Sequence, residues 1–302
     1  MEAATDRIRT IPDPQEPVPL VAWPTLALFI VAGLLYIGSC VLAVSHKIPW
    51  PLATAINAVA GYLMFTVTHE ASHHAASANS RLNLWLGRFA MPFFAPPIGF
   101  RAFRFIHMQH HQHTNKTDGS DPDEWTMGGS NPVSMLARWF TLDLHYVTWY
   151  APKFKKRPVA ERREALFEGG LWLAVVVGLI VSGNFFWLLV LYLLPSRLTI
   201  GFLGWAFDYL PHTGLDATPK EDRFQATRNR VGYERLIKWG LLYQNYHLVH
   251  HLHPVVPFYR YIRVWRKAED EYLANGPALS TLNGRPLTVD EYRQLRHLQD
   301  HH

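Results

Sequence analysis

The centre of the chain carries the stretch HMQHHQH at residues 107–113, with four histidines in seven residues. Two other stretches are equally dense: HEASHH at residues 69–74 and HLVHHLH at residues 247–253. Eleven of the 17 histidines therefore lie in three short windows. Histidines three or four residues apart lie on one face of a helix, where two imidazoles can bind one ion. Each window is thus a predicted metal clamp.

Nearly uncharged runs flank these windows. Residues 21–45 and 48–68 contain no charged side chain, and a spanning helix needs about 20 such residues. Residues 165–207 hold only two charges, and a turn sequence at 182–184 divides them. We expect four transmembrane helices in two hairpins, at about 21–45, 48–68, 165–182 and 184–207. The alternative is four buried helices of a large soluble core, but such long runs with Trp and Tyr near their ends are rare there.

Charge predicts the orientation. Lys47 is the only charge between the first two runs, whereas residues 81–163 hold twelve Lys and Arg, so the positive-inside rule places residues 81–163 in the cytoplasm. Prolines interrupt the apolar residues 84–100, which we expect to lie in the membrane interface or to re-enter it rather than to cross. All three histidine windows and both termini then face the cytoplasm, at the bacterial inner membrane if the chain is prokaryotic.

These features predict an all-α integral membrane protein with a cytoplasmic helical domain that carries a histidine-rich di-metal site. We expect a polar lead-in over residues 1–20, the membrane domain over 21–275 and a polar tail over 276–302. In that tail Thr288 and Glu291 match a capping box that opens a short helix. The lone Cys40 excludes a disulfide framework and an iron–sulfur ligand set. The net charge of +5 suits anionic lipid or an acidic partner, but basic residues that only set the membrane topology would explain it equally well, and it gives no reason to invoke nucleic acid.

A further candidate ligand is His212, at the end of the fourth run in the sequence Asp208-Tyr-Leu-Pro-His212. Its position at a helix end, on the side where the windows gather, favours a ligand over an ordinary interfacial histidine. So many imidazoles exceed the four ligands of one zinc ion and indicate two ions. Imidazole accepts zinc, copper, iron or nickel, so the spacing does not name the metal.

At these boxes the chain resembles the membrane fatty-acid desaturase and hydroxylase superfamily, whose signature is three histidine boxes at the cytoplasmic ends of four spans. Residues 105–115, 207–212 and 244–253 look closest to the cyanobacterial type of β-carotene hydroxylase. The resemblance implies that two irons are bound by His69, His73, His107, His110, His111, His212, His247, His250 and His251. It also implies a catalytic role for Asp208, near where acyl desaturases often have a residue that holds a metal-bound water. An Asp departs from the Asn of acyl-CoA desaturases.

Five more residues near the boxes are weaker candidates. His74, His113 and His253 flank the boxes, and Asp121 and Asp123 follow the second one. Each could orient a ligand imidazole through a hydrogen bond. Hydrated neighbours or loop caps would fit the same positions.

The resemblance implies that the enzyme uses O2 to hydroxylate or desaturate an unactivated C–H site of a long lipid, either a fatty acyl chain or a carotenoid. Hydroxylation of a carotenoid β-ring and oxidative decarboxylation of a fatty acid are the narrower alternatives. The chain has no cysteine ligand set and no Gly-x-Gly-x-x-Gly motif. We therefore expect electrons from a separate ferredoxin- or rubredoxin-type donor.

Two functions of other classes compete with this interpretation. His69-Glu70-Ala-Ser-His73 matches the His-Glu-x-x-His motif of zinc metallohydrolases, although a zinc hydrolase would leave two boxes unused. A membrane metal transporter would also use histidines, but near the bilayer midplane within broken helices. The boxes instead lie at the predicted helix ends and beyond them.

Overall fold

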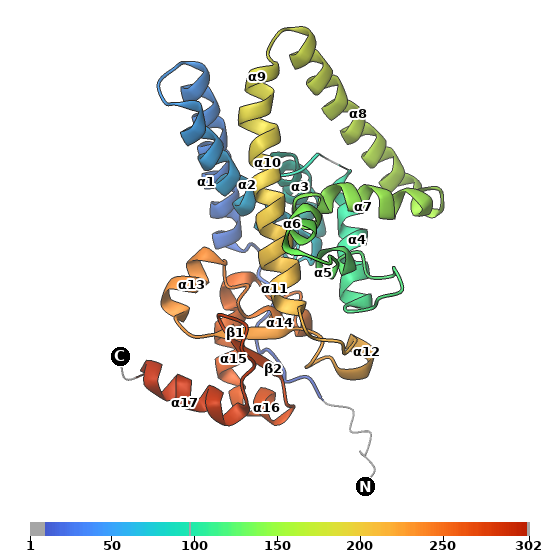
Figure 1. The fold of residues 1–302 in the computed structure, drawn as a ribbon. Helices are drawn as coiled ribbons and strands as arrows, with labels where there is room; N and C mark the ends of the chain where they lie inside the picture. The colour runs from blue at the N-terminus through green and yellow to red at the C-terminus, as the bar shows by residue number, and fades with distance from the viewer. Residues whose placement is uncertain (1–9, 97, 301–302) are drawn as a thin grey trace.

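Helices account for most of the chain in the computed structural model, which describes residues 10–96 and 98–300 (Figure 1). The first nine residues of the expected lead-in and the last two of the expected tail lie outside the described residues. Four helices are long and apolar enough to cross a membrane: α1 (Trp23–Val44), α2 (Trp50–Ser72), α8 (Val159–Val181) and a composite fourth helix over Phe185–His212. The fourth helix joins α9 (Phe185–Leu188), the π-helix η3 (Leu189–Leu193), α10 (Leu194–Leu203), the π-helix η4 (Gly204–Tyr209) and α11 (Leu210–His212).

Shorter elements surround one end of the long helices. The α-helices among them are α3 (Ser80–Ala90), α4 (Phe100–His113), α5 (Glu124–Met127), α6 (Pro132–Phe140), α7 (Leu142–Tyr150), α12 (Pro219–Asp222), α13 (Glu234–Gly240), α14 (His247–Leu252), α15 (Tyr261–Lys267), α16 (Glu269–Ala274) and α17 (Val289–Asp300). Three 3-10 helices, η1 (Met91–Phe93), η2 (Ala151–Lys156) and η5 (Phe258–Arg260), complete the helical part. The strands are β1 (Arg228–Val231) and β2 (Ala278–Thr281).

Helix α8 begins before its apolar run because the glutamates in its first turns form hydrogen bonds and ion pairs. Glu161 accepts hydrogen bonds from Tyr150 and Arg157, each at 2.7 Å. Glu164 is bound by Arg88 and by the Arg101 side chain at 2.9 Å. Buried carboxylates are tolerated when they are paired in this way. The helix can therefore begin at Val159, before the nearly uncharged run that starts at residue 165.

A proline in the fourth helix explains how the long helices are held together. Pro195 has no N–H to bond the carbonyl of Leu191, one turn earlier. That carbonyl accepts instead from Tyr36 Oη of α1 at 2.8 Å and from Asn57 Nδ2 of α2 at 2.9 Å. The neighbouring carbonyl of Val190 accepts from Thr54 of α2 at 2.6 Å. Polar side chains of α1 and α2 thereby satisfy the irregular backbone of the π-helix η3.

Residues 84–100 are not among the four long helices. They run through α3 and η1 to the start of α4, and α3 leaves Trp85 and Phe89 more than half exposed. The ring of Phe100 lies against Gly87, where a Cβ atom would come within 2.2 Å of it. Because only glycine permits this approach, α3 can fold closely against the first turn of α4.

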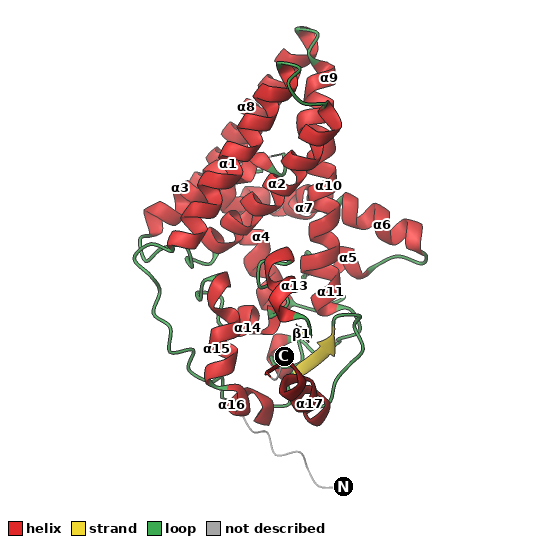
Figure 2. Cartoon of the chain, turned by 90° about the vertical axis from the view of Figure 1, so that its left-hand side faces the viewer, coloured by secondary structure: helices red, strands yellow, loops and turns green. Residues whose placement is uncertain are grey.

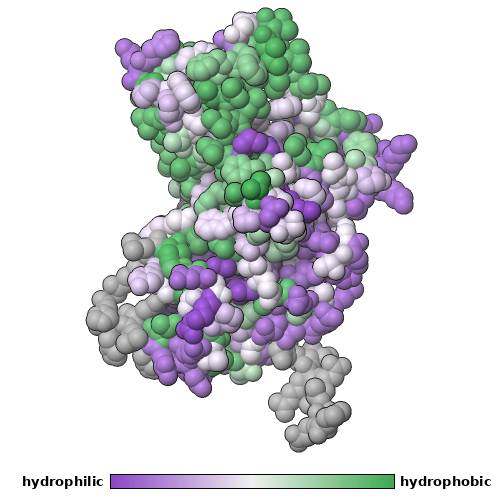
Figure 3. Space-filling model, in the orientation of Figure 1, coloured by the Kyte–Doolittle hydropathy of each residue, from purple (hydrophilic) through white to green (hydrophobic). Residues whose placement is uncertain are grey.

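A polar lobe, defined here as residues 10–20 and 215–300, lies at one end of the long helices (Figure 2). Its core is aromatic, with Tyr246, Tyr261, Trp265 and Tyr272 fully buried. Strands β1 and β2 form a two-stranded parallel sheet within it, so the expectation of an all-α chain missed a small sheet. Figure 3 shows hydrophobic residues concentrated over the long helices and hydrophilic ones over the lobe.

The lobe includes both ends of the described chain. Glu16 forms ion pairs with Arg260, Arg263 and Lys267 and so fastens the lead-in to α15. At the other end Thr288 and Glu291 exchange hydrogen bonds at the start of α17, which confirms the predicted capping box. Tyr292 of α17 is buried against Trp265, so this helix packs into the lobe.

Replacing Asn57 by Leu tests the cross-helix bonds. The change removes the donor to Leu191 and the contacts of the same amide with Ser39 and Cys40, while it keeps the number of side-chain heavy atoms, so we expect a loss of roughly 0.6–2 kcal/mol of stability. The measurement is the unfolding temperature in detergent. Val59→Leu, on the exposed face of the same helix, serves as the control. An Asn57→Leu protein as stable as this control would contradict the role assigned to the bond.

Candidate metal centre

Four parts of the fold bring the predicted histidine ligands to one place. His69 lies in the last turn of α2, and His73 caps that helix. Helix α4 contributes His107, His110 and His111, α11 contributes His212, and α14 contributes His247, His250 and His251. Within each helix the spacing of three or four residues turns the imidazoles to one side.

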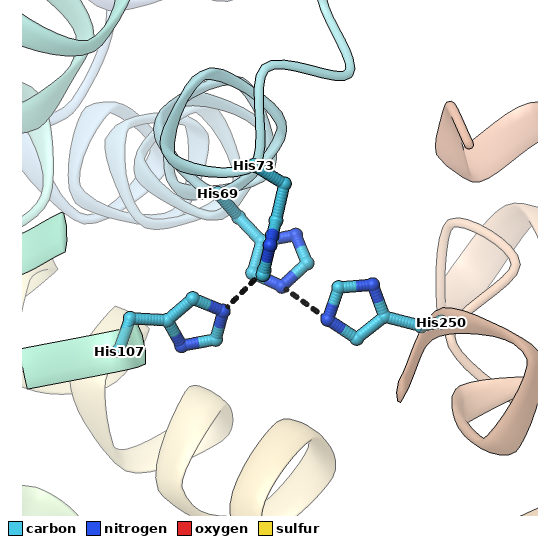
Figure 4. Close-up of side chains that lie close together, drawn as sticks. All are labelled: His69, His73, His107 and His250. Carbon is cyan, nitrogen blue, oxygen red and sulfur yellow. Dashed lines mark hydrogen bonds between the residues drawn. The ribbon is translucent and has the colours of Figure 1, made fainter. Parts of the chain in front are cut away.

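The first group consists of His69, His73, His107 and His250, whose nearest ring nitrogens all lie within 4.8 Å of one another (Figure 4). The Nε2 atoms of His73 and His107 are 2.7 Å apart, and those of His69 and His250 are 3.1 Å apart. Two nitrogens bound to one ion at about 2.0–2.1 Å would be separated by roughly 3 Å. The spacing therefore fits a shared ion.

The second group consists of His110, His212, His247 and His251, again within 4.8 Å of one another. The Nε2 atoms of His247 and His251 are 3.1 Å apart. His212 Nδ1 donates to the carbonyl of Ala226 at 3.2 Å, while its buried Nε2 has no hydrogen-bond partner. A buried acceptor nitrogen without a hydrogen-bond donor costs stability. A metal ion could instead bind the lone pair of His212 Nε2.

His111 lies between the two groups. Its Nε2 is 3.0 Å from Nε2 of His250 in the first group, and its ring stacks at 4.1 Å on His251 of the second. All nine imidazoles that the resemblance implied thus form two adjoining sets. The donor set fits two ions that favour imidazole, and the chemistry of the nitrogens alone allows zinc, copper, iron or nickel.

Electrostatics favour neutral ligands at most of these positions. Burial, followed by repulsion from neighbouring imidazoles, holds the pKa of His107, His111 and His251 well below its usual value. A neutral imidazole keeps the lone pair that a metal needs. These residues are therefore ready to coordinate at neutral pH.

His110 differs because carboxylates face its other nitrogen. Its Nδ1 lies 3.0 Å from Asp121 Oδ1 and 3.2 Å from Asp123 Oδ2. Burial opposes the charged form, but Asp123 and Asp121 outweigh it and raise the pKa of His110 to about 10. A carboxylate on Nδ1 fixes the ring and strengthens Nε2 as a ligand, and an ion at Nε2 would replace the proton there.

Two other ligand candidates have comparable supports. His250 Nδ1 lies 2.9 Å from the Tyr261 hydroxyl, and His247 Nδ1 lies 3.0 Å from Gln244 Oε1. Sequence reasoning did not single out Tyr261 or Gln244. Gln244 is the first residue of the stretch 244–253, one of those on which the family resemblance rests. The position of Tyr261, by contrast, depends on the turn after α14.

The flanking histidines lie outside both groups. His253 Nε2 contacts the hydroxyl of Tyr272 at 2.7 Å, in the core of the lobe. His74 Nδ1 is 3.5 Å from the side-chain nitrogen of Asn83. His113 lies at the end of α4, and its Nδ1 is buried without a hydrogen-bond partner.

The carboxylate of Glu70 forms a hydrogen bond to the backbone of the lobe. Its Oε2 accepts a hydrogen bond from the backbone N–H of Phe258 at 3.1 Å. A zinc hydrolase would need this carboxylate as a general base beside the metal. The contact with Phe258 argues against that role.

An apolar cavity adjoins both groups. It is lined by ligand candidates (His69, His107, His110 and His247) and by apolar and aromatic side chains such as Phe65, Phe94, Phe103, Ile200, Leu203 and Phe207. Asp208, Asp143 and Tyr146 also line it, and no Lys or Arg does. Asp208 projects from the π-helix η4, an irregularity common at functional sites. Sequence reasoning identified Asp208 but missed Asp143 and Tyr146, which carry no motif.

Comparison with known proteins gives a consistent picture. The family model described as fatty acid desaturase matches residues 45–283. A β-carotene ketolase from a Paracoccus strain is 31% identical over 199 residues, which cover 65% of this chain and 71% of the ketolase. The sn-1 oleoyl-lipid 12-desaturase of Arthrospira platensis is 24% identical over 283 residues, 83% of this chain and 78% of that protein. The dihydrorhizobitoxine desaturase of Bradyrhizobium elkanii is 24% identical over 260 residues, with shares of 77% and 72%.

Two tyrosines of the lobe provide a matched test of the centre. Tyr261→Phe removes the hydroxyl that supports His250, so we expect metal affinity to fall by roughly 10–100-fold. Tyr272→Phe removes the hydroxyl that meets His253 and should leave metal affinity unchanged. The measurement is metal retained by each purified protein during titration with a chelator. Equal retention by the two variants would contradict the assignment of His250 as a ligand.

Proposed function

Because the chain belongs to the fatty acid desaturase family, we propose that it is a membrane di-iron oxidoreductase that uses O2 to oxidise an unactivated C–H site of a long hydrophobic lipid. The observation that carries the proposal is the pair of adjoining histidine groups at the wall of an apolar cavity. Side chains alone cannot oxidise such a bond, so a redox metal is required. Iron held by the nine histidines would supply the reduction of O2 and the abstraction of hydrogen.

The chain's own residues position the substrate and exclude water. The aromatic and aliphatic walls of the cavity suit a hydrocarbon segment, and the described residues that line it include no Lys or Arg to bind an anionic headgroup. Asp208 lies four residues before His212 and lines the same cavity. We assign it the role of holding a water or the substrate's polar end by hydrogen bonds to its carboxyl group, next to the ligands.

A carotenoid is the first substrate class that we propose. The β-carotene ketolase shares 31% identity, against 24% for the two desaturases compared above. A carotenoid ring is also uncharged, which suits the apolar part of the cavity lining. The second candidate is desaturation of an acyl lipid, which the similarity to the oleoyl-lipid desaturase supports. In either case a separate ferredoxin- or rubredoxin-type protein would supply electrons.

We further propose that the polar lobe and both termini face the cytoplasm. The segments that carry the basic residues between 81 and 163, from α3 to the first turn of α8, lie toward the lobe end of the long helices (Figure 1), and the positive-inside rule expects basic residues on the cytoplasmic side. The metal groups lie at the same end of those helices. Protons and electrons would then come from the cytoplasm.

The function can be tested by supplying each substrate class to the purified protein with a ferredoxin, its reductase and O2. We expect an oxygen-dependent ketone or alcohol on a β-carotene ring. Acyl-lipid double bonds without any carotenoid product would favour the second candidate. His212→Ala should abolish turnover, whereas His253→Ala should retain it. Turnover that persists in His212→Ala or without O2 would overturn the proposal.

The cavity can be tested separately from the metals. Leu203→Trp adds a large ring at the cavity wall, so we expect turnover to fall at least tenfold while metal content stays unchanged. Leu198→Trp, on an exposed part of the same helix, is the matched control. Product formation and metal content are measured for both. Unchanged turnover in Leu203→Trp would show that substrate binds elsewhere.

A further inference from the structure

A second hollow lies on the opposite face of the fourth helix. Ile200, Leu203 and Phe207 face the apolar cavity beside the histidines, whereas Phe202, Trp205 and Tyr209 line a separate open groove. The other walls of this groove come from α13 and from the sheet, whose arrangement around the lower part of the fourth helix is visible in Figure 1. The groove therefore does not belong to the candidate metal centre.

Two buried arginines lie at the floor of the groove. Arg228 and Arg230 occupy alternate positions of β1 and are only 6% and 5% exposed. Arg228 donates to the carbonyl of Thr213, and Arg230 donates to the carbonyls of Leu210 at 2.5 Å and Leu282 at 2.8 Å. The Nε atoms of both are buried without a hydrogen-bond partner. Among the described residues, no carboxylate forms an ion pair with either arginine.

This arrangement leaves two like charges only partly compensated. Carbonyls at the end of a helix attract a cation, but they do not neutralise it. Burial, and then repulsion from Arg228, lowers the pKa of Arg230 to about 10. Buried charges are stable when they are paired with an opposite charge. An anion in the groove would supply that pairing for both guanidinium groups, which line it.

The walls of the groove indicate what carries the anion. Phe202 and Trp205 belong to a helix suited to cross a membrane, so the upper part of the groove adjoins lipid. Helix α13 presents Trp239, 64% exposed, next to Lys238. Aromatic and basic side chains together are typical of a membrane–water interface. The ligand must therefore combine an anionic group with apolar chains.

We propose that this groove binds an anionic phospholipid, with its phosphate against Arg228 and Arg230 and an acyl chain along Phe202 and Trp205. The lipid is a bound structural or regulatory partner and not the substrate, because the fourth helix separates it from the metal centre. Its negative charge would tie the strand β1 to the end of the fourth helix. This in turn would steady His212, whose Nδ1 bonds to Ala226 two residues before β1.

Gly240 allows the groove to be blocked without touching the arginines. It lines the groove at the end of α13, and a Cβ atom there would meet nothing within 4 Å. Gly240→Ala should therefore be neutral, whereas Gly240→Phe should fill the space that the lipid needs. Arg230→Gln removes one of the two charges directly.

The test measures the unfolding temperature of the delipidated full-length protein with phosphatidylglycerol, phosphatidylcholine or inorganic phosphate, together with lipid retention by native mass spectrometry. We expect phosphatidylglycerol to raise the unfolding temperature of the wild type and Gly240→Ala, and to be retained by both. In Gly240→Phe and Arg230→Gln its binding should weaken by roughly tenfold or more.

Three results would overturn the proposal. Phosphatidylcholine as effective as phosphatidylglycerol would indicate an unselective lipid contact. Inorganic phosphate as effective as the lipid would indicate a free-anion site. Equal protection of wild type and Gly240→Phe would place the lipid elsewhere, and this variant decides the matter even if Arg230→Gln does not fold.

Discussion

Nine imidazoles meet in one largely buried region, and the rest of the fold is arranged to make this possible. Each buried ring nitrogen needs a hydrogen-bond partner or an ion, because an unsatisfied polar group in the interior lowers the stability of the fold. The imidazoles come from the end of α2, from α4, from the end of the fourth helix and from α14. These segments can meet only if the membrane helices deliver their ends to the same side. The formation of the site therefore depends on the topology of the long helices.

The imidazoles have an apolar environment on one side and a polar environment on the other. Toward the long helices the nitrogens adjoin aromatic and aliphatic walls that exclude water. Toward the lobe their outer nitrogens meet Asp121, Gln244, Tyr261 and the carbonyl of Ala226. The apolar side suits a hydrocarbon, and the polar side fixes the rings. Glu70 links the two sides by holding the backbone of Phe258 beside Tyr261.

Much of this architecture could be predicted from the sequence where one local rule decides. Runs with few or no charges predicted the four long helices, and spacing predicted which histidines share a helix face. The extension of α8 could not be predicted, because Glu161 and Glu164 depend on cations from distant segments. The sheet was missed because β1 and β2 have four residues each, too few for a periodicity signal. Tyr261 and Tyr272 look alike in sequence, and only packing determines which one supports a ligand candidate.

The most direct test of the account is the number of iron ions per chain in the full-length protein, purified from iron-supplied cells and measured by elemental analysis alongside zinc. Two adjoining sets of imidazoles predict about two ions per chain, and the proposed oxidation with O2 predicts that these ions are iron, with no stoichiometric zinc. One zinc per chain, with iron absent, would contradict the account, because a single four-coordinate ion would leave most of the nine imidazoles without a function.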